Sequence, residues 1–221
     1  MLRTETVVPE MLEVLKELQS NPLFFNFYLA GGTSLALQLG HRTSTDIDLF
    51  SYSEQNFVKI IQYLNKHPDK YKIDEYQEGF IRLYTNGIKV ELIYDDMGKL
   101  IKEPKNIDGI IFLDKSEIAP MKLKAITGRT KSRDLIDFAY LLQEMSLENI
   151  FNLYKEKYGA VNINILKREL LFKSKIINED DWLIGIKMIK NDIKPQNIPN
   201  IIKQSIDEYN ISIGINSNKT S

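Results

Sequence analysis

The chain has 221 residues, of which 43% are hydrophobic and 27% charged, and its 29 lysine and arginine residues nearly balance 30 aspartate and glutamate residues. This composition is typical of a globular protein with one large domain or two modest ones, and it gives no overall basic charge that would indicate nucleic-acid binding. Because cysteine is absent, disulfides and thiolate metal sites are excluded, which fits a reducing cytoplasm, where we expect the protein to act. We expect no signal peptide and no membrane span, since no apolar run is long enough.

The first third of the chain alternates helical and strand-like patterns. In Pro9–Ser20 apolar residues recur on one helical face behind an initial proline, which predicts a helix. The run FNFYLAGG then predicts a short buried strand that ends at glycines. TSLALQLG predicts a short helix, with Thr33 or Ser34 near its N-cap and Gly40 near its C-cap, and TDIDLF predicts a second strand.

The remaining patterns divide the chain into an α/β part and a helical part. EQNFVKIIQYLNKH predicts a helix, and three strand-like runs follow it: YKIDEYQEG, FIRLYTNG and IKVELIYD. Asn86-Gly87 predicts a hairpin between the last two runs, and GIIFLD adds a further strand. Beyond residue 115 the patterns are helical. We therefore predict an α+β fold, with a small mixed sheet and flanking helices in residues 1–115 and a helical bundle in residues 116–221.

Two aspartates stand one residue apart in the apolar strand TDIDLF. Alternate residues of a strand point to the same side, so Asp46 and Asp48 face one way while Ile47 and Leu49 face the core. Two such carboxylates repel each other unless a cation lies between them, and their hard oxygen atoms suit Mg²⁺, with Mn²⁺ as an alternative. Chance gives about four acidic-x-acidic pairs in a chain of this composition, so the pair gains meaning only from its context.

That context is a glycine turn upstream of the pair. Gly31 and Gly32 end one predicted strand and open a helix, where backbone N–H groups are available to a phosphate, and Thr33 and Ser34 add hydroxyl donors. A plain strand-to-helix turn is the alternative interpretation of these glycines.

A second group of charged residues lies in the helical part. Lys122 and Arg129 are two helical turns apart on one face and could hold a triphosphate, the alternative being a solvated basic face. On the next predicted helix Asp134 and Asp137 also share a face. Asp134 is close enough to the helix start to favour it electrostatically, whereas Asp137 lies among apolar residues and is the better candidate for a site residue.

Two blocks of the sequence resemble one known family. GGTSLALQLGHRTSTDIDLF resembles the nucleotidyltransferase superfamily signature, in which a glycine turn precedes an Asp-x-Asp strand, and more narrowly the AbiEii/AbiGii toxin family of bacterial nucleotidyltransferases. EIAPMKLKAITGRTKSRDLIDFAYLL, downstream of it, resembles a second block of the same family. Two blocks in the right order are far more specific than either alone, and the resemblance extends over roughly residues 9–172.

The resemblance implies a nucleotidyltransferase fold and a Mg²⁺-dependent reaction, in which a nucleoside monophosphate passes from an NTP to an acceptor and pyrophosphate is released. Asp46 and Asp48 would bind the metal and act in catalysis. Many nucleotidyltransferases have a third metal carboxylate on a later strand, and the matching position here is Glu91, where the family more often has aspartate. Glu91 is therefore a candidate third ligand.

The resemblance also implies which residues hold the nucleotide. Lys122 would contact phosphate, and Asp137 would position the substrate or Lys122; both are expected to act in catalysis. The residues assigned to nucleotide binding are Gly31, Gly32, Thr33, Ser34, Lys122, Arg129 and Asp134.

The family further implies a toxin of a toxin–antitoxin or phage-defence system, with a separately encoded antitoxin as partner and tRNA as a candidate acceptor. An RNA acceptor requires a local basic surface. Five basic residues could provide it, unless they only form a solvated helix face: Lys157, Lys167, Arg168, Lys173 and Lys175. Two other hypotheses remain: a non-catalytic module that binds NTP or a partner, and an enzyme that adenylates antibiotics.

Overall fold

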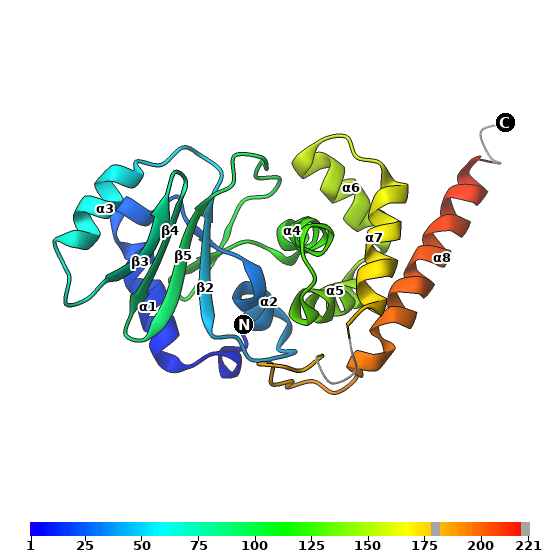
Figure 1. The fold of residues 1–221 in the computed structure, drawn as a ribbon, viewed down its shortest axis with the longest axis horizontal. Helices are drawn as coiled ribbons and strands as arrows, with labels where there is room; N and C mark the ends of the chain where they lie inside the picture. Colours follow the sequence, from blue (N-terminus) through cyan, green and yellow to red (C-terminus); the bar gives the residue numbers. More distant parts are fainter. Residues whose placement is uncertain (178–181, 218–221) are drawn as a thin grey trace. The chain divides into compact units, whose positions relative to one another are not determined.

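The computed structural model describes residues 1–177 and 182–217, and the chain divides into two units, Met1–Ile118 and Ala119–Ser221. The first unit is a mixed sheet with helices and the second is helical (Figure 1), so the predicted α+β fold class is confirmed. The division falls after Ile118, whereas the boundary expected from the sequence was after residue 115; both lie within the first turn of α4 (Lys115–Gly128).

The elements follow the predicted order closely. The helices are α1 (Pro9–Ser20), α2 (Gly31–Leu39), α3 (Phe57–Asn65), α4 (Lys115–Gly128), α5 (Ser132–Glu144), α6 (Leu147–Tyr158), α7 (Ile163–Lys175) and α8 (Ile198–Ser217). The strands are β1 (Tyr28–Leu29), β2 (Asp46–Ser51), β3 (Lys72–Gln77), β4 (Phe80–Thr85), β5 (Ile88–Tyr94), β6 (Lys105–Ile107) and β7 (Ile110–Phe112).

The seven strands form one sheet in the order β3-β4-β5-β2-β1-β7-β6. β2 is parallel to β5, and β1 is parallel to β7, while the other neighbouring pairs are antiparallel. The hairpin predicted between β4 and β5 is present, with positive φ at both Asn86 (50°) and Gly87 (73°), as its tight turn requires. The short strand β6 was not predicted from the sequence.

The core of the first unit lies on one face of the sheet. In β2 burial alternates: Ile47 and Leu49 are fully buried, whereas Asp46, Asp48 and Phe50 are half-buried. α1 and α3 contribute their apolar faces to the same core (Figure 1). The central members of this core are Met11, Leu15, Leu18, Phe24, Phe27, Ile47, Leu49, Ile60, Leu64, Ile81, Leu83, Val90 and Leu92.

Helix α2 begins earlier than its sequence pattern suggests. Its first residue is Gly31, with φ +63°, and the extended residue Ala30 is its N-cap. Thr33 and Ser34 therefore lie inside the first turn and do not cap the helix, so that part of the prediction is wrong. The predicted C-cap is confirmed: Gly40 is left-handed (φ 68°), and its N–H donates to the Ala36 carbonyl at 2.8 Å.

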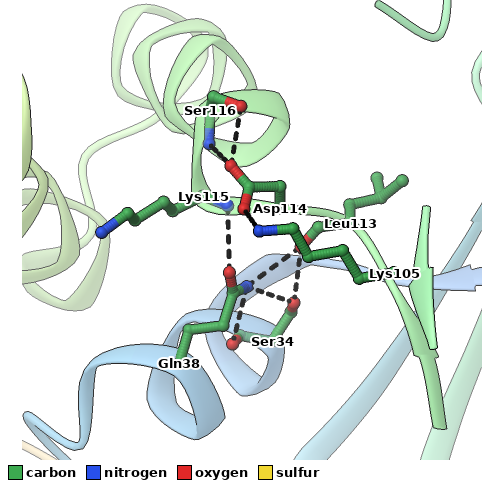
Figure 2. A network of polar contacts seen from close by, with 7 residues as sticks. All are labelled: Ser34, Gln38, Lys105, Leu113, Asp114, Lys115 and Ser116. Carbon is green, nitrogen blue, oxygen red and sulfur yellow. Dashed lines mark hydrogen bonds and ion pairs between the residues drawn. The ribbon is translucent and has the colours of Figure 1, made fainter. Parts of the chain in front are cut away.

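A polar network anchors α2 to the turn between β7 and α4 (Figure 2). The Ser34 hydroxyl donates to the Leu113 carbonyl at 3.1 Å, and the Gln38 amide donates to the same carbonyl at 3.0 Å. The N–H of Lys115 in turn donates to Gln38 Oε1 at 3.1 Å. One glutamine side chain thus satisfies backbone groups of a segment far away in the sequence.

The same turn is fixed by a carboxylate at the start of α4 (Figure 2). Asp114 Oδ1 accepts hydrogen bonds from the Ser116 N–H at 2.9 Å and the Ser116 hydroxyl at 2.7 Å, and Lys105 pairs with Oδ2. Burial alone would raise the pKa of Asp114, but these hydrogen bonds and the Lys105 charge outweigh it and lower the pKa to about 2. The carboxylate is therefore ionised at neutral pH and holds the first turn of the helix.

The second unit contains helices that pack around one another. α8 packs against α5, α6 and α7, and Phe151 of α6 meets Tyr209 of α8 edge-on, with ring centroids 5.0 Å apart. Over residues 1–177 and 182–217, none of the helices combines the length and the apolar character needed to cross a bilayer.

We predict that Gln38→Leu lowers the free energy of unfolding by about 1–3 kcal/mol, because it removes the acceptor of the Lys115 N–H and one donor to the Leu113 carbonyl. Urea denaturation measures the change. Gln62→Leu, at an exposed position of α3, is the matched control and should change the free energy far less. Equal effects of the two substitutions would show that the network does not stabilise the fold.

Candidate active site

The two aspartates of β2 lie on the face of the sheet opposite the core. Asp46 and Asp48 are half-buried, whereas Ile47 between them is fully buried, so both carboxylates point away from the apolar layer. The expected shared face is therefore present. A pair of half-buried carboxylates on one strand is a set of hard oxygen donors beside open solvent.

The turn at the start of α2 lies directly against one of these aspartates. A Cβ atom on Gly31 would be 2.4 Å from Asp48 Oδ2, a distance that atoms in contact never reach, and the φ of +63° also favours glycine. The Ala30 N–H donates to the Asp48 carbonyl at 2.9 Å and fixes the strand and the turn together. Glycine is required at this position for both space and conformation.

The hydroxyls next to the glycines have structural partners. Thr33 Oγ1 donates to the Asp46 carbonyl and lies 2.8 Å from Ser44 Oγ, while Ser34 donates to the Leu113 carbonyl. Both Thr33 and Ser34 are almost fully buried. These two side chains hold α2 against the strand and its neighbours, which leaves the backbone of Gly31 and Gly32 as the part of the turn best suited to a phosphate.

The parallel pairing of β2 with β5 brings two more charged side chains to the same face. Asp46 is in register with Lys89, and Asp48 is in register with Glu91. Lys89 Nζ lies 3.2 Å from Asp46 Oδ2 and 3.6 Å from Glu91 Oε1. Burial alone would lower the pKa of Lys89, but the charges of Glu91 and Asp46 outweigh it and raise that pKa.

Glu91 is held by a second cation from β4. Arg82 Nε donates to Glu91 Oε1 at 2.8 Å, and Arg82 also binds Glu75 of β3 at 2.6 Å. Burial alone would raise the pKa of Glu91, but the hydrogen bond from Arg82 and the charge of Lys89 outweigh it, and the pKa is lowered. The candidate third metal ligand is therefore the shared acceptor of two cationic side chains.

These residues suit a divalent cation at Asp46 and Asp48. Both carboxylates point to the same side of the sheet, and the space that a Cβ on Gly31 would fill is left to Asp48. In the described part of the chain, no three His, Cys, Asp or Glu side chains are grouped so that they could hold a metal ion together. Two protein carboxylates are a number that Mg²⁺ typically uses beside substrate phosphates and water.

The second unit holds a separate charged cluster. Lys122 of α4 is only 6% exposed, and its Nζ lies 3.0 Å from Asp134 Oδ1 and 2.6 Å from Asp137 Oδ2, both carboxylates belonging to α5 and being almost fully buried. Asp137 thus contacts Lys122, as one of the two roles expected for it requires. A lysine shared by two buried carboxylates ties α4 to α5.

Asp134 does more than favour the start of α5. Arg129 donates to it at 2.8 Å through Nε, so its carboxylate binds both basic residues of the predicted phosphate face. Burial alone would raise the pKa of Asp134, but the charge of Lys122 and the hydrogen bond from Arg129 outweigh it and lower that pKa. This ion cluster therefore stabilises the unit at neutral pH, and the stabilisation is lost as the pH falls below about 4.

Comparison with known protein families assigns the chain to one of them. Residues 13–209 match the family described as nucleotidyl transferase AbiEii toxin of Type IV toxin–antitoxin systems. The chain belongs to this family. The protein is accordingly a nucleotidyltransferase, and the family implies an NTP as substrate and an antitoxin as partner.

The chain is also similar to individual proteins. An uncharacterized protein of Aquifex aeolicus is 28% identical over 208 residues, which cover 90% of this chain and 96% of the relative. Two solved structures share the fold. An H. pylori protein assigned as a nucleotidyltransferase has a TM-score of 0.51 and 22% identity, over 88% of this chain and 89% of its own. The nucleotidyltransferase toxin MenT4 of Mycobacterium tuberculosis has a TM-score of 0.56 and 14% identity, over 89% of this chain and 80% of its own.

Three charged residues that make ion pairs or hydrogen bonds in the structure were not singled out as site residues from the sequence. Arg82 reaches Glu91 because β4 pairs with β5, which the sequence does not show directly. Lys89 pairs with Glu91 along β5, and the spacing of these two alternate residues was the sequence pattern that could have indicated the pair. Glu117 of α4 is fully buried and accepts backbone hydrogen bonds from Ile101 (2.6 Å) and Lys102 (2.5 Å). It fixes the loop that precedes β6.

A large cleft of the first unit lies away from the aspartates. Its volume is about 780 Å³, and it is lined by the start of α3, the turn between β3 and β4, and Tyr94 at the end of β5. Tyr76 in its wall pairs with Ile81, a core residue, so the cleft opens on the core side of the sheet. It contains none of the predicted site residues.

We predict that Gly31→Ala weakens Mg²⁺-dependent NTP binding, because the new methyl group must displace the Asp48 carboxylate. Gly87→Ala is the matched control: Gly87 also has positive φ (+73°), but a Cβ there meets no atom within 4 Å. Both variants should lose about 1–2 kcal/mol of stability from backbone strain, while only Gly31→Ala should lose ligand binding in calorimetry. If both bind Mg²⁺–NTP like wild type, the turn does not set the position of Asp48.

We predict that Lys122→Met lowers the free energy of unfolding by about 3–5 kcal/mol, because Asp134 and Asp137 are then buried without the lysine charge. Adding Asp137→Asn to this variant should restore part of the loss, since it removes one of the two buried charges. Lys203→Met is the control, because the Lys203–Asp207 pair is exposed and should contribute less than about 1 kcal/mol. Urea denaturation of the wild type, the two single variants and the double variant measures the free energy of unfolding. Similar decreases for Lys122→Met and Lys203→Met would contradict a stabilising role of the cluster.

Proposed function

We propose that this nucleotidyltransferase binds Mg²⁺ or Mn²⁺ through Asp46 and Asp48 and transfers a nucleoside monophosphate from an NTP to tRNA. The observation that supports this most directly is the contact of Gly31 with Asp48: the first turn of a helix and a carboxylate pair meet at a position where only glycine fits. This arrangement puts a phosphate-binding feature and a cation-binding feature side by side.

In the proposed reaction, the acceptor hydroxyl oxygen forms a bond to the α-phosphorus of the NTP. The bond from the α-phosphorus to the bridging oxygen breaks, and pyrophosphate leaves with that electron pair, while the hydroxyl proton passes to solvent or to a carboxylate of the site. A bound divalent cation supplies Lewis-acid stabilisation of the phosphoryl charge. Asp46 and Asp48 hold and orient the cation, and the N–H groups of Gly31 and Gly32 at the positive end of α2 bind the leaving phosphates.

The second cluster is proposed to bind nucleotide as well. The family resemblance assigns phosphate contact to Lys122 and Arg129 and a supporting role to Asp134 and Asp137. The ion pairs within this cluster hold Lys122 and Arg129 in fixed positions. Basic side chains that are already fixed lose less conformational freedom when they bind a phosphate.

The tRNA acceptor is proposed from the family resemblance and from basic side chains on α7. Arg168 is highly exposed, and Lys167 donates to Asn210 of α8 at 2.8 Å. Lys157 was expected to contribute to the same surface, but it belongs to α6 and is only 2% exposed. We propose that the protein acts in the cytoplasm as the toxin of a phage-defence system whose antitoxin is encoded separately.

The decisive experiment incubates the protein with Mg²⁺, each radiolabelled NTP in turn, and total RNA. We expect label in the tRNA band with one preferred NTP, and no label with the Asp48→Asn variant. Label in an added aminoglycoside but not in RNA would replace tRNA by an antibiotic as acceptor. NTP binding without transfer to either would contradict the proposed reaction.

We predict that Asp48→Asn melts close to the wild type without ligand, since it removes one of two neighbouring carboxylates that repel each other. It should lose the stabilisation that Mg²⁺ with NTP gives the wild type, which is about 2.7 kcal/mol at a ligand concentration 100 times the Kd. Thermal melts with and without Mg²⁺–NTP measure both effects. A variant that melts much lower alone, yet gains as much from Mg²⁺–NTP, would show that Asp48 is structural.

A further inference from the structure

Lys89 places a positive charge at the carboxylates proposed for the metal. The register of β2 with β5 puts Lys89 beside Asp46, and Glu91 beside Asp48, on one face of the sheet. The Lys89 ammonium lies 3.2 Å from an Asp46 oxygen and 3.6 Å from a Glu91 oxygen. Its side chain is 25% exposed, and those of Asp46 and Glu91 are 26% and 17% exposed. A partly desolvated cation therefore lies between a proposed metal ligand and the expected third ligand.

The Glu91 carboxylate is already bound to two cations. The same oxygen, Oε1, accepts from Arg82 Nε at 2.8 Å and lies 3.6 Å from Lys89 Nζ. Arg82 is itself fixed by Glu75 at 2.6 Å. A metal ion that used this oxygen would have to displace both basic side chains, and Arg82 would lose its planar, charge-assisted contact.

The cluster holds more carboxylates than cations. Lys89 and Arg82 face Asp46, Asp48 and Glu91, and Arg82 also pairs with Glu75 and Asp74, so the negative charge is not neutralised by the protein's own cations. Enzymes with two metal ions use the second ion to stabilise charge on the same phosphoryl group, and a further carboxylate usually holds it. Here the Lys89 ammonium lies between Asp46 and the carboxylate expected as the further ligand, Glu91.

We infer that Lys89 takes the place of a second metal ion in this site, and that Glu91 is a positioning residue for Lys89 and not a metal ligand. The site then binds one divalent cation, through Asp46 and Asp48. Because Lys89 and the cation share Asp46, the lysine also weakens cation binding in the absence of nucleotide. This inference rests on the proposed function of the two aspartates.

The alternative is that Lys89 only stabilises the sheet. Cross-strand ion pairs contribute modestly to folding, and in that case loss of the lysine would lower stability without changing metal binding. Metal binding measured directly, without turnover, therefore separates the two interpretations.

The test uses Mn²⁺ as the probe and counts bound ions per chain by electron paramagnetic resonance, with the full chain and no nucleotide. Wild type should bind one Mn²⁺, and Lys89→Met should bind Mn²⁺ roughly tenfold more tightly, because a like charge near the site is removed. Lys89→Arg, which keeps the charge, should resemble wild type. Lys59→Met removes the same charge from an exposed position of α3, which packs on the core face of the sheet, and should also resemble wild type.

One glutamate variant and one aspartate variant complete the test. Glu91→Gln should still bind one Mn²⁺ at saturation, whereas Asp48→Asn should not. Two Mn²⁺ ions per wild-type chain, loss of Mn²⁺ from Glu91→Gln, or an unchanged Mn²⁺ affinity of Lys89→Met would each overturn the inference while leaving Asp46 and Asp48 as ligands. Mn²⁺ binding that survives Asp48→Asn unchanged, or no Mn²⁺ binding by wild type, would overturn the proposed metal site itself and this inference with it.

Discussion

The parallel pairing of β2 with β5 is the constraint on which the candidate site depends. It aligns Asp46 with Lys89 and Asp48 with Glu91, and it puts the intervening apolar residues of both strands into the core. Because side chains alternate along a strand, a shift of one residue would turn the carboxylates of β2 into the apolar layer. The burial of Ile47, Leu49, Val90 and Leu92 therefore sets the register and, with it, the geometry of the charges on the other face.

The two units manage charge in different ways. On the sheet, the carboxylates and cations are half-buried, so each ion pair contributes little to stability and the group can exchange partners with a ligand. Between α4 and α5, Lys122 and two aspartates are almost completely buried, so the group must stay paired for the unit to remain folded. The first arrangement suits a site where ions enter and leave, and the second holds the basic side chains proposed to contact the nucleotide in fixed positions.

Local patterns were enough to predict most of the elements and the shared face of the aspartates. The amphipathic run of α1, the alternation in β2 and the Asn86-Gly87 turn each act within a few residues, and all three are present. The contacts that could not be predicted involve residues far apart in the sequence. Only the pairing of β4, β5 and β2 makes Glu91 an acceptor for Arg82 and Lys89. The start of α2 was misjudged because Gly31 is held by its contact with β2, which helix propensity does not report.

The anchoring of α2 affects the stage of folding at which the candidate site forms. The hydrogen bond from Ser34 to Leu113 joins residues 79 apart in the sequence, and Gln38 reaches the same carbonyl across 75. Closing a loop of this length is slow compared with forming a helix or a hairpin. We therefore expect the glycine turn to become fixed late, after β7 has joined the sheet. During synthesis, a growing chain on the ribosome lacks both of these hydrogen bonds until Leu113 has emerged.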